Sequence, residues 1–344
     1  MTGVQTCALP ILLGEPSGDE GRGSQGKVYR FKNENYGREG QPQFVAVKVM
    51  DYAEGMKEHH MYARAQSRSH PSDHIVKIFG NLDVEGKTWY ALVMEYCPRS
   101  LTNFVCRIRE ANPFPSNYLQ NVQRLFTELC DVLHFIHNRG VTHRDIKPGN
   151  ILLTSDIDDE CHLKISDFGI AKMLERDLTQ IDRGTDTFKA PEVESGHYTY
   201  KIDIWSAGVV LYYMLTGSVS LFRVGRHAAM TIFEKEPDCV AQRIGNFLLP
   251  AIQFEDINGP CLQVLQSLLV YDPNKRMDWD EIICLEWLTE GKEERFVNIG
   301  ENVYKYYTKP LIGKGASCEV FKGVTASTPA VAVAVKVVKE EYVR

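Results

Sequence analysis

The chain has 344 residues, of which 44% are hydrophobic and 24% charged, enough to bury the core of one large domain or two smaller ones. This balance excludes a wholly disordered protein, and a formal net charge of −6 disfavours a chain built to coat nucleic acid. The longest apolar runs, such as 208–215, are too short to span a bilayer. The nine cysteines form no CxxC pair and no even set for disulfides, so we expect a reducing, cytoplasmic location, with the nucleus as an alternative.

The first eleven residues are set apart from the rest. The string VQTCALPILL begins at Val4 with no basic residue before it, which argues against a signal peptide. The run GVQTCALPI instead resembles a translated sequencing-adapter scar. We therefore expect residues 1–11 to be non-native and exclude them from the fold.

Strands are predicted first and helices afterwards. Apolar alternation predicts strands over 27–31 and 44–47, on either side of a polar, glycine-rich loop, and further strands over 75–79 and 89–94. Apolar residues on one face predict a helix over 119–136, and two further apolar segments predict helices over 203–215 and 262–270; a hairpin-like segment near 141–166 lies between helices. This order predicts an α+β enzyme with a small β-rich lobe, a larger helical lobe and a cleft between them.

The C-terminal stretch repeats the beginning of the chain. A charged linker is expected over 291–302. After it, IGKGASCEVFKG and VAVKVV resemble the earlier GRGSQGKVYR and VAVKVM. We therefore expect residues 12–290 to form one complete domain and residues 303–344 to be the truncated start of a second copy.

Three glycines near the start, Gly21, Gly23 and Gly26, precede Val28 in the pattern GxGxxGxV. Glycines let backbone amides approach phosphate oxygens, although such a turn alone is a weak signal and a surface loop is its default interpretation. Glu20 stands where an apolar residue usually precedes this pattern. Residues 12–14 are therefore the alternative first strand, with an insertion before Gly23.

An ordered set of motifs carries the chemistry. VAVK at 45–48 ends an apolar strand on a lysine, and HRDIKPGN at 143–150 is followed by DFG at 167–169 and APE at 190–192. A snorkelling lysine or a turn aspartate would explain one motif but not the ordered set. Together they resemble the catalytic lysine, catalytic loop, metal-binding triplet and activation-segment end of the protein kinase family. The resemblance covers roughly 12–290 and implies the bilobal kinase fold.

The resemblance also implies ATP and Mg²⁺ as cofactors and gives the polar residues their roles. Asp145 would accept the substrate hydroxyl proton, and Lys147 would neutralise charge near the γ-phosphate. Asn150 and Asp167 would supply oxygen ligands for Mg²⁺, while Lys48 would hold the α- and β-phosphates. The glutamate that pairs with Lys48 is left open: Glu58 is the first choice and Glu54 the alternative.

Further positions follow from the same resemblance. Adenine would lie between Val28, Ala46 and Leu152, beside the gatekeeper Met94 and the hinge of Glu95, Tyr96 and Cys97. Asp203 would brace the backbone of the catalytic loop, and Arg276 would pair with Glu192. Arg144 would receive a phosphate from the activation segment, where Thr179 is the candidate.

Serine/threonine specificity is indicated by Lys147, two residues after Asp145, and by Thr185, which would hydrogen-bond to both. We expect protein substrates with Ser or Thr acceptors, no nucleic acid beyond the nucleotide and no membrane partner; the oligomeric state is not predicted. The C-terminal repeat keeps Lys336 but has Cys318 in place of its third glycine, so we expect it to be inert.

The sequence disfavours two other classes of protein. A catalytically weak or inactive kinase-like scaffold in a tandem-kinase protein is disfavoured because Lys48, Asp145 and Asp167 are all kept. A small-molecule kinase of the aminoglycoside or choline type is disfavoured by Lys147-Pro148 and by Glu192.

Overall fold

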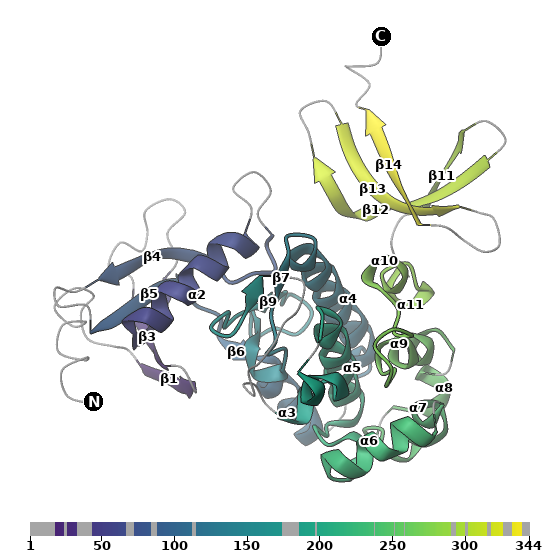
Figure 1. Ribbon diagram of the computed structural model, residues 1–344, viewed down its shortest axis with the longest axis horizontal. Coiled ribbons are helices and arrows are strands. Elements are labelled where there is room, and N and C mark those ends of the chain that lie inside the picture. The colour runs from purple at the N-terminus through teal and green to yellow at the C-terminus, as the bar shows by residue number, and fades with distance from the viewer. Residues whose placement is uncertain are drawn as a thin grey trace.

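The computed structural model shows a β-rich part at the N-terminus, a helical part in the middle and a separate β-sheet near the C-terminus (Figure 1). The residues it describes are 18–23, 26–32, 43–66, 72–83, 88–111, 115–173, 186–196, 198–236, 238–250, 252–257, 259–289, 294–299, 302–314, 318–325 and 332–338.

The N-terminal lobe is a five-stranded antiparallel sheet in the order β1-β2-β3-β5-β4. Its strands are β1 (Gly18–Gly23), β2 (Gly26–Lys32), β3 (Phe44–Asp51), β4 (Ile78–Asp83) and β5 (Trp89–Glu95), and α2 (Tyr52–Ala65) follows β3 directly. Side chains alternate along β3: Val45, Val47 and Val49 join a small outer core, whereas Ala46 and Met50 join the main one. Lys48, between the last two, therefore belongs to the same face as Ala46.

The first strand contains two of the predicted glycines. β1 pairs with β2 in a hairpin in which Gly23 lies opposite Gly26, so the strand before the turn is 18–23. The alternative first strand at 12–14 lies outside the described residues, as does the tip of the hairpin at 24–25. A Cβ on Gly26 would lie 2.5 Å from the Val49 carbonyl oxygen, so only glycine allows β2 to approach β3 this closely.

The helical lobe is built around α5, which is buried on all sides from Ile202 to Thr216 and ends at Gly217 in a left-handed conformation (φ 65°). Its helices are α3 (Leu101–Glu110), α4 (Tyr118–His137), α5 (Lys201–Thr216), α6 (Arg226–Lys235), α7 (Cys239–Arg243), α8 (Phe254–Ile257), α9 (Pro260–Leu268), α10 (Trp279–Ile282) and α11 (Glu286–Thr289). The 3₁₀ turns are η1 (Pro148–Asn150), η2 (Asp186–Phe188), η3 (Pro191–Ser195), η4 (Leu221–Arg223) and η5 (Ile244–Asn246).

Short strands carry the segment between α4 and α5. They are β6 (Arg99–Ser100), β7 (Val141–Thr142), β8 (Ile151–Leu153), β9 (Leu163–Ile165) and β10 (Lys172–Met173). β6, β8 and β9 form one small sheet, and β7 pairs with β10. Together with the two lobes, this arrangement confirms the expected α+β, bilobal protein kinase fold.

A second sheet follows the helical lobe, in the order β11-β12-β13-β14. Its strands are β11 (Glu294–Ile299), β12 (Asn302–Lys314), β13 (Cys318–Thr325) and β14 (Ala332–Val338). The segment predicted as a linker at 291–302 contains the strand β11. All six residues of β11 pair with β12. The sheet therefore begins earlier than the expected residue 303.

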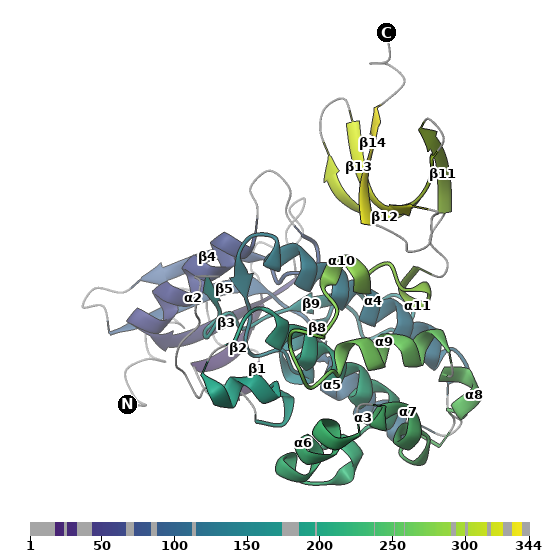
Figure 2. The same ribbon diagram turned by 45° about the vertical axis from the view of Figure 1, so that its right-hand side comes forward.

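The views agree on where this second sheet lies. In Figures 1 and 2 it extends beyond α10 and α11, away from the N-terminal sheet.

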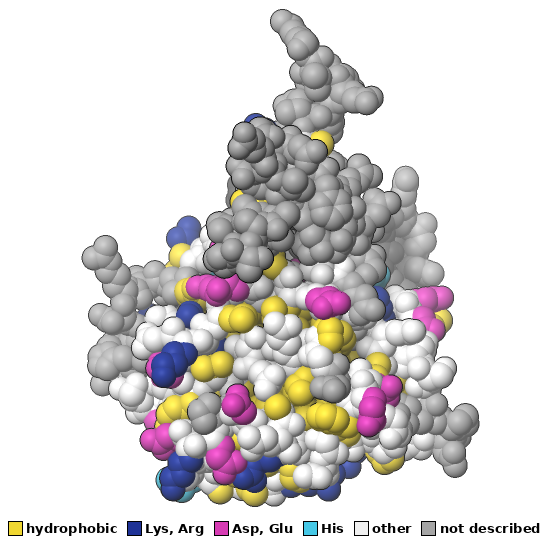
Figure 3. Space-filling view, turned by 90° about the vertical axis from the view of Figure 1, so that its right-hand side faces the viewer, with side chains coloured by type: hydrophobic (Ala, Val, Ile, Leu, Met, Phe, Trp, Pro, Cys, Tyr) yellow, Lys and Arg dark blue, Asp and Glu magenta, His cyan; other side chains and the backbone are white. Residues whose placement is uncertain are grey.

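On the face of the helical lobe that Figure 3 shows, charged side chains of both signs lie among hydrophobic ones. Within the described part of the chain, no helix has the length and apolar character that a bilayer crossing needs.

Candidate active site

Lys48 pairs with two carboxylates, one from its own lobe and one from the helical lobe. Its Nζ lies 2.7 Å from Oε2 of Glu58 on α2 and 2.8 Å from Oδ1 of Asp167, which follows β9. Glu58 is buried, whereas Glu54, one turn earlier on α2, is exposed. The structure thus places Glu58, rather than Glu54, beside Lys48.

Burial and charge shift the pKa values of all three groups. Burial would lower the pKa of Lys48, but the carboxylates of Glu58 and Asp167 outweigh it and raise that pKa. Burial raises the pKa of Glu58 to about 7, against the opposing effect of Lys48. The pKa of Asp167 is lowered because the adjacent Lys48 ammonium outweighs its burial. Lys48 is therefore held as a cation next to an ionised Asp167.

The catalytic loop gathers Asp145, Lys147 and Asn150 around one carboxylate. Lys147 Nζ lies 2.7 Å from Asp145 Oδ2, and Asn150 Nδ2 donates to the same oxygen and to the Asp145 carbonyl, both at 2.9 Å. The turn η1 begins with Pro148 and brings Asn150 back toward Asp145. Because the amide nitrogen of Asn150 is engaged here, its side-chain oxygen is the atom left to bind a cation.

Asp167 is held in an unusual backbone conformation. Its φ is 66°, and its N–H donates to the Tyr62 hydroxyl at 2.9 Å. The next side chain, Phe168, packs between Tyr62 (ring centroids 4.6 Å apart) and His143 (4.8 Å). Sequence analysis missed Tyr62, although its place one helical turn after Glu58 puts both side chains on one face of α2.

Asp203 braces the catalytic loop from α5. It is fully buried, and its two oxygens accept the backbone N–H groups of His143 at 2.8 Å and Arg144 at 2.9 Å. Arg144 has a positive φ of 68°, which is strained for a non-glycine residue. These hydrogen bonds fix the backbone directly before Asp145.

A second buried contact ties the lobe together at the end of the APE motif. Arg276 Nη1 lies 2.6 Å from Glu192 Oε1, and Nη2 lies 3.1 Å from Oε2, a two-pronged ion pair. The Arg276 side chain also donates to the carbonyls of Val270 and Lys201. The expected pairing of Arg276 with Glu192 is thus present.

The residues expected around adenine lie on one face of the N-terminal sheet and on β8. Ala46 is opposite Met94 across β3 and β5, and Val28 is opposite Lys48 across β2 and β3. Leu152 lies on β8 and is half-buried. These positions supply small or apolar side chains at the boundary of the two lobes.

The hinge is anchored by Glu95. Its Oε2 accepts the Lys77 N–H at 3.2 Å and lies 3.0 Å from Lys164 Nζ on β9. Burial raises the pKa of the Cys97 thiol to about 12, so the thiol stays neutral.

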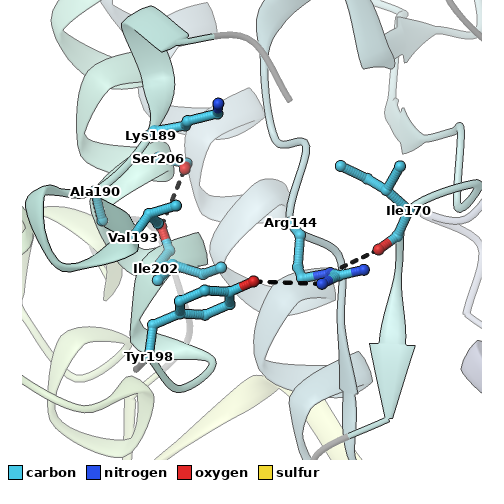
Figure 4. A pocket seen from close by; sticks show the side chains of 8 residues that line it. All are labelled: Arg144, Ile170, Lys189, Ala190, Val193, Tyr198, Ile202 and Ser206. Atoms are coloured by element: carbon cyan, nitrogen blue, oxygen red, sulfur yellow. Dashed lines mark hydrogen bonds between the residues drawn. The ribbon is translucent and has the colours of Figure 1, made fainter. Parts of the chain in front are cut away.

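A small pocket adjoins the catalytic loop (Figure 4). Arg144 reaches into it, donating through Nε to the Ile170 carbonyl at 2.6 Å, with Nη1 3.4 Å from the Tyr198 hydroxyl. Lys189 adds a second cation to the lining. The phosphate-bearing residue expected here, Thr179, and the specificity residue Thr185 lie outside the described residues.

The donor set suits a hard cation. Asp167 offers a carboxylate that is 21% exposed, and Asn150 offers its amide oxygen. Oxygen ligands of this kind, few in number and completed by phosphate and water, are those that Mg²⁺ takes in phosphoryl-transfer enzymes. The two residues therefore fit the metal that the resemblance implies.

Comparison with known proteins agrees with this geometry. The family model for the protein kinase domain matches residues 18–288. The chain belongs to the protein kinase family. Use of ATP and a divalent metal follows from membership of this family. The match spans both lobes and ends within α11, so it leaves out the sheet of β11–β14.

Several relatives of this kinase domain are serine/threonine-protein kinases. The chain is 33% identical over 220 residues to serine/threonine-protein kinase STK11 of Gallus gallus, which covers 62% of this chain and 45% of that protein. It is 33% identical over 172 residues to the ovarian-specific serine/threonine-protein kinase Lok of Drosophila melanogaster (48% and 34%). It is 34% identical over 177 residues to serine/threonine-protein kinase cds1 of Schizosaccharomyces pombe (49% and 36%). The match spans less than half the length of each relative.

Proposed function

We propose that this chain is a serine/threonine protein kinase that transfers the γ-phosphate of ATP to hydroxyl groups of protein substrates. The proposal rests on the pairing of Lys48 with both Glu58 and Asp167. This pairing places the Lys48 cation beside Asp167, the carboxylate expected to bind the metal. The acceptor class is supported by the relatives, all named as serine/threonine-protein kinases.

Asp145 is the base in this proposal. The substrate hydroxyl would donate its proton to the Asp145 carboxylate, whose Oδ2 is held by Lys147 and Asn150. Lys147 then stays beside the reacting oxygen and balances the negative charge that develops during transfer. Since the chain supplies positioning and charge rather than a covalent nucleophile, most of the rate enhancement comes from electrostatics.

Lys48 and the oxygen ligands position the nucleotide. Bound ATP supplies the transferable phosphoryl group, and bound Mg²⁺ neutralises its phosphates. Asp167 and Asn150 would hold the metal, and Lys48 would hold the α- and β-phosphates while Glu58 fixes its ammonium. The glycine hairpin with Gly21, Gly23 and Gly26 would cover the phosphates with backbone amides.

The adenine site and the second sheet complete the proposal. Val28, Ala46 and Leu152 would enclose the ring, next to Met94 and the hinge at Glu95 and Cys97. Residues 303–344 would be the start of a second kinase domain, without activity of its own. Thr185 as a specificity residue and a cytoplasmic location remain predictions.

The test is transfer of labelled phosphate from ATP to casein in the presence of Mg²⁺, with Asp167→Ala as the variant. Loss of the carboxylate should lower the rate by at least about a hundredfold. Asp156→Ala, which removes an exposed carboxylate on a distant loop, should match the unaltered chain. Label on serine or threonine is expected. Equal labelling in the Asp167 variant, or label on tyrosine alone, would contradict the proposal.

A further inference from the structure

A chain of buried hydrogen bonds connects α10 with the catalytic loop. Trp279, the first residue of α10, donates from Nε1 to His137 Nδ1 at 2.6 Å. His137, the last residue of α4, lies with Nε2 at 2.8 Å from Asp203 Oδ2. Asp203 in turn accepts the backbone N–H groups of His143 and Arg144. The side chains of His137 and Asp203 are 4% and 0% exposed, so water does not compete for these bonds.

The direction of these bonds follows from the indole. A tryptophan N–H can only donate, so His137 Nδ1 must accept and carry no proton. The remaining proton of the neutral ring is then on Nε2, where it donates to the Asp203 carboxylate. Trp279 thus selects one of two tautomers of His137. In the other tautomer, two N–H groups would face each other at Nδ1, and the Asp203 oxygen would face a bare nitrogen.

Asp203 needs this donor. Its carboxylate is completely buried, and it is stabilised there by three N–H groups, one from His137 and two from the catalytic loop. The loop residue Arg144 is held at φ 68°, a strained conformation that persists only while the surroundings fix it. A misplaced Asp203 would therefore release the backbone that precedes Asp145.

We propose that Trp279 is a positioning residue for catalysis: its indole N–H fixes the His137 tautomer through which Asp203 holds the catalytic loop. Trp279 touches none of the reacting groups and lies 142 residues from His137 in sequence. A tryptophan that only filled space would not need its N–H. Trp205 provides the comparison, since it is equally buried but its Nε1 has no hydrogen-bond partner among the described residues.

The first measurement is made on the unaltered chain, with one variant used only to assign the signal. In the chain labelled with ¹⁵N-histidine, long-range ¹H–¹⁵N correlation reports which ring nitrogen of each histidine carries the proton, and His137→Gln identifies the His137 signal by its loss. The expected pattern is a protonated Nε2 and a bare Nδ1. A protonated Nδ1 in the unaltered chain would overturn the proposal.

The second measurement compares Trp279→Phe with Trp205→Phe, two changes that keep a buried ring and remove one indole N–H. In Trp279→Phe, the His137 signals should show the second tautomer, and the amides of His143 and Arg144 should exchange with deuterium at least about fivefold faster. In Trp205→Phe both should match the unaltered chain. Equal effects of the two changes, or no effect of Trp279→Phe, would refute the proposal.

The third measurement rests on the proposed kinase activity. Trp279→Phe should lower kcat by roughly five- to tenfold, the effect of one hydrogen bond, and leave KM for ATP unchanged because Lys48 and its partners are not involved. A rise in KM with constant kcat would contradict a role in the catalytic loop. If the chain transferred no phosphate at all, the tautomer and exchange measurements would still decide the role of Trp279.

Discussion

The charge on Glu58 controls whether Lys48 is held in place. Glu58 is almost completely buried, and burial raises its pKa to about 7, into the range where cells and assays operate. Above that pH the carboxylate is ionised and can pair with Lys48. Below it, Glu58 takes up a proton, and its ion pair with Lys48 is lost.

Transfer activity should therefore rise with pH through about 7. The pKa of Glu58 in the folded chain lies above its ordinary value of 4.5. Between 4.5 and about 7 Glu58 is therefore still largely protonated in the folded chain, and the ionised form that pairs with Lys48 appears only as the pH rises through about 7. We expect kcat/KM for ATP to increase across that range, as measured in buffers of constant ionic strength. Glu58→Gln should stay at the low-pH level and lose this acid limb. An acid limb that persists in the variant would assign the effect to another group.

Arg276 should contribute more to stability than any exposed ion pair. Its side chain is 0% exposed and pairs with Glu192, so Arg276→Ala would leave a buried carboxylate without its cation. We expect a loss of about 3–5 kcal/mol in the free energy of unfolding, measured by urea denaturation. Arg243→Ala is the matched control, because its pair with Glu236 is 39% and 41% exposed and should cost about 0–1 kcal/mol. Similar losses in both would contradict this account.

At the scale of the elements, helix α2 packs closely against β5 of the N-terminal sheet. Gly55 faces Tyr90 on β5 so tightly that a Cβ would lie 2.5 Å from Tyr90 Cβ. His59, one turn later, places Nδ1 2.6 Å from the Tyr90 hydroxyl. The two contacts set the height of α2 over the sheet, and with it the position of Glu58.

Replacing Gly55 with alanine should push α2 off the sheet. The added methyl group would meet the Cβ and Cγ atoms of Tyr90, which lie close to the backbone and cannot rotate away. We therefore expect a loss of about 1–3 kcal/mol in folding stability. KM for ATP should rise several-fold as Glu58 withdraws from Lys48. Gly80→Ala is the control, since among the described residues no atom beyond its chain neighbours lies within 4 Å of its Cβ position. An unchanged KM in the Gly55 variant would show that α2 does not set the Lys48 site.

Sequence patterns predicted the long elements because each carries its own signal. The stripe of apolar residues in 119–136 and the largely apolar run in 203–215 correspond to α4 and α5. The choice between Glu54 and Glu58 could not be made that way, since both lie on one face of α2 at a spacing of four. It depends on how deep the helix packs, which Gly55 and Tyr90 determine.

At the scale of the whole molecule, the N-terminal sheet and the sheet of β11–β14 pair their lysine-bearing strands in the same register. Val28 lies opposite Lys48 across β2 and β3, and Val320 lies opposite Lys336 across β13 and β14. The lysines differ in their surroundings: Lys48 is 5% exposed and paired with two carboxylates, whereas Lys336 is exposed. Among the described residues, the repeat therefore copies the strands, but no ion pair is seen at its lysine.

Only the first lysine should matter for activity. Lys48→Ala should reduce phosphate transfer by at least about a hundredfold, because the cation that orients the phosphates is lost. Lys336→Ala, the same change at the matching position of the second sheet, should leave both the rate and the melting temperature unaltered. The comparison is made on the full chain by steady-state kinetics and thermal denaturation. A loss of rate in the Lys336 variant would show that the second sheet takes part in the reaction.

The motifs gave most of the candidate site, because each combines a reactive side chain with a backbone turn that local sequence can specify. Asn150 donates to Asp145, and Asp167 pairs with Lys48. The supporting contacts were not predictable, since Trp279 and His137 meet only after the whole helical lobe has packed. The charged run around 291–295 predicts a linker, whereas residues 294–299 form β11 by pairing with β12, a distant partner that this run does not specify.

The positive φ angles of Arg144 and Asp167 carry a consequence for evolution. Each holds a non-glycine residue in a left-handed conformation that costs roughly 1–2 kcal/mol, and both stand directly at the catalytic machinery. At both positions the backbone alone would favour glycine, but Arg144 donates to the Ile170 carbonyl and Asp167 pairs with Lys48, contacts that glycine cannot make. The site thus keeps two side chains at a backbone cost that only a chain with no need of them could shed.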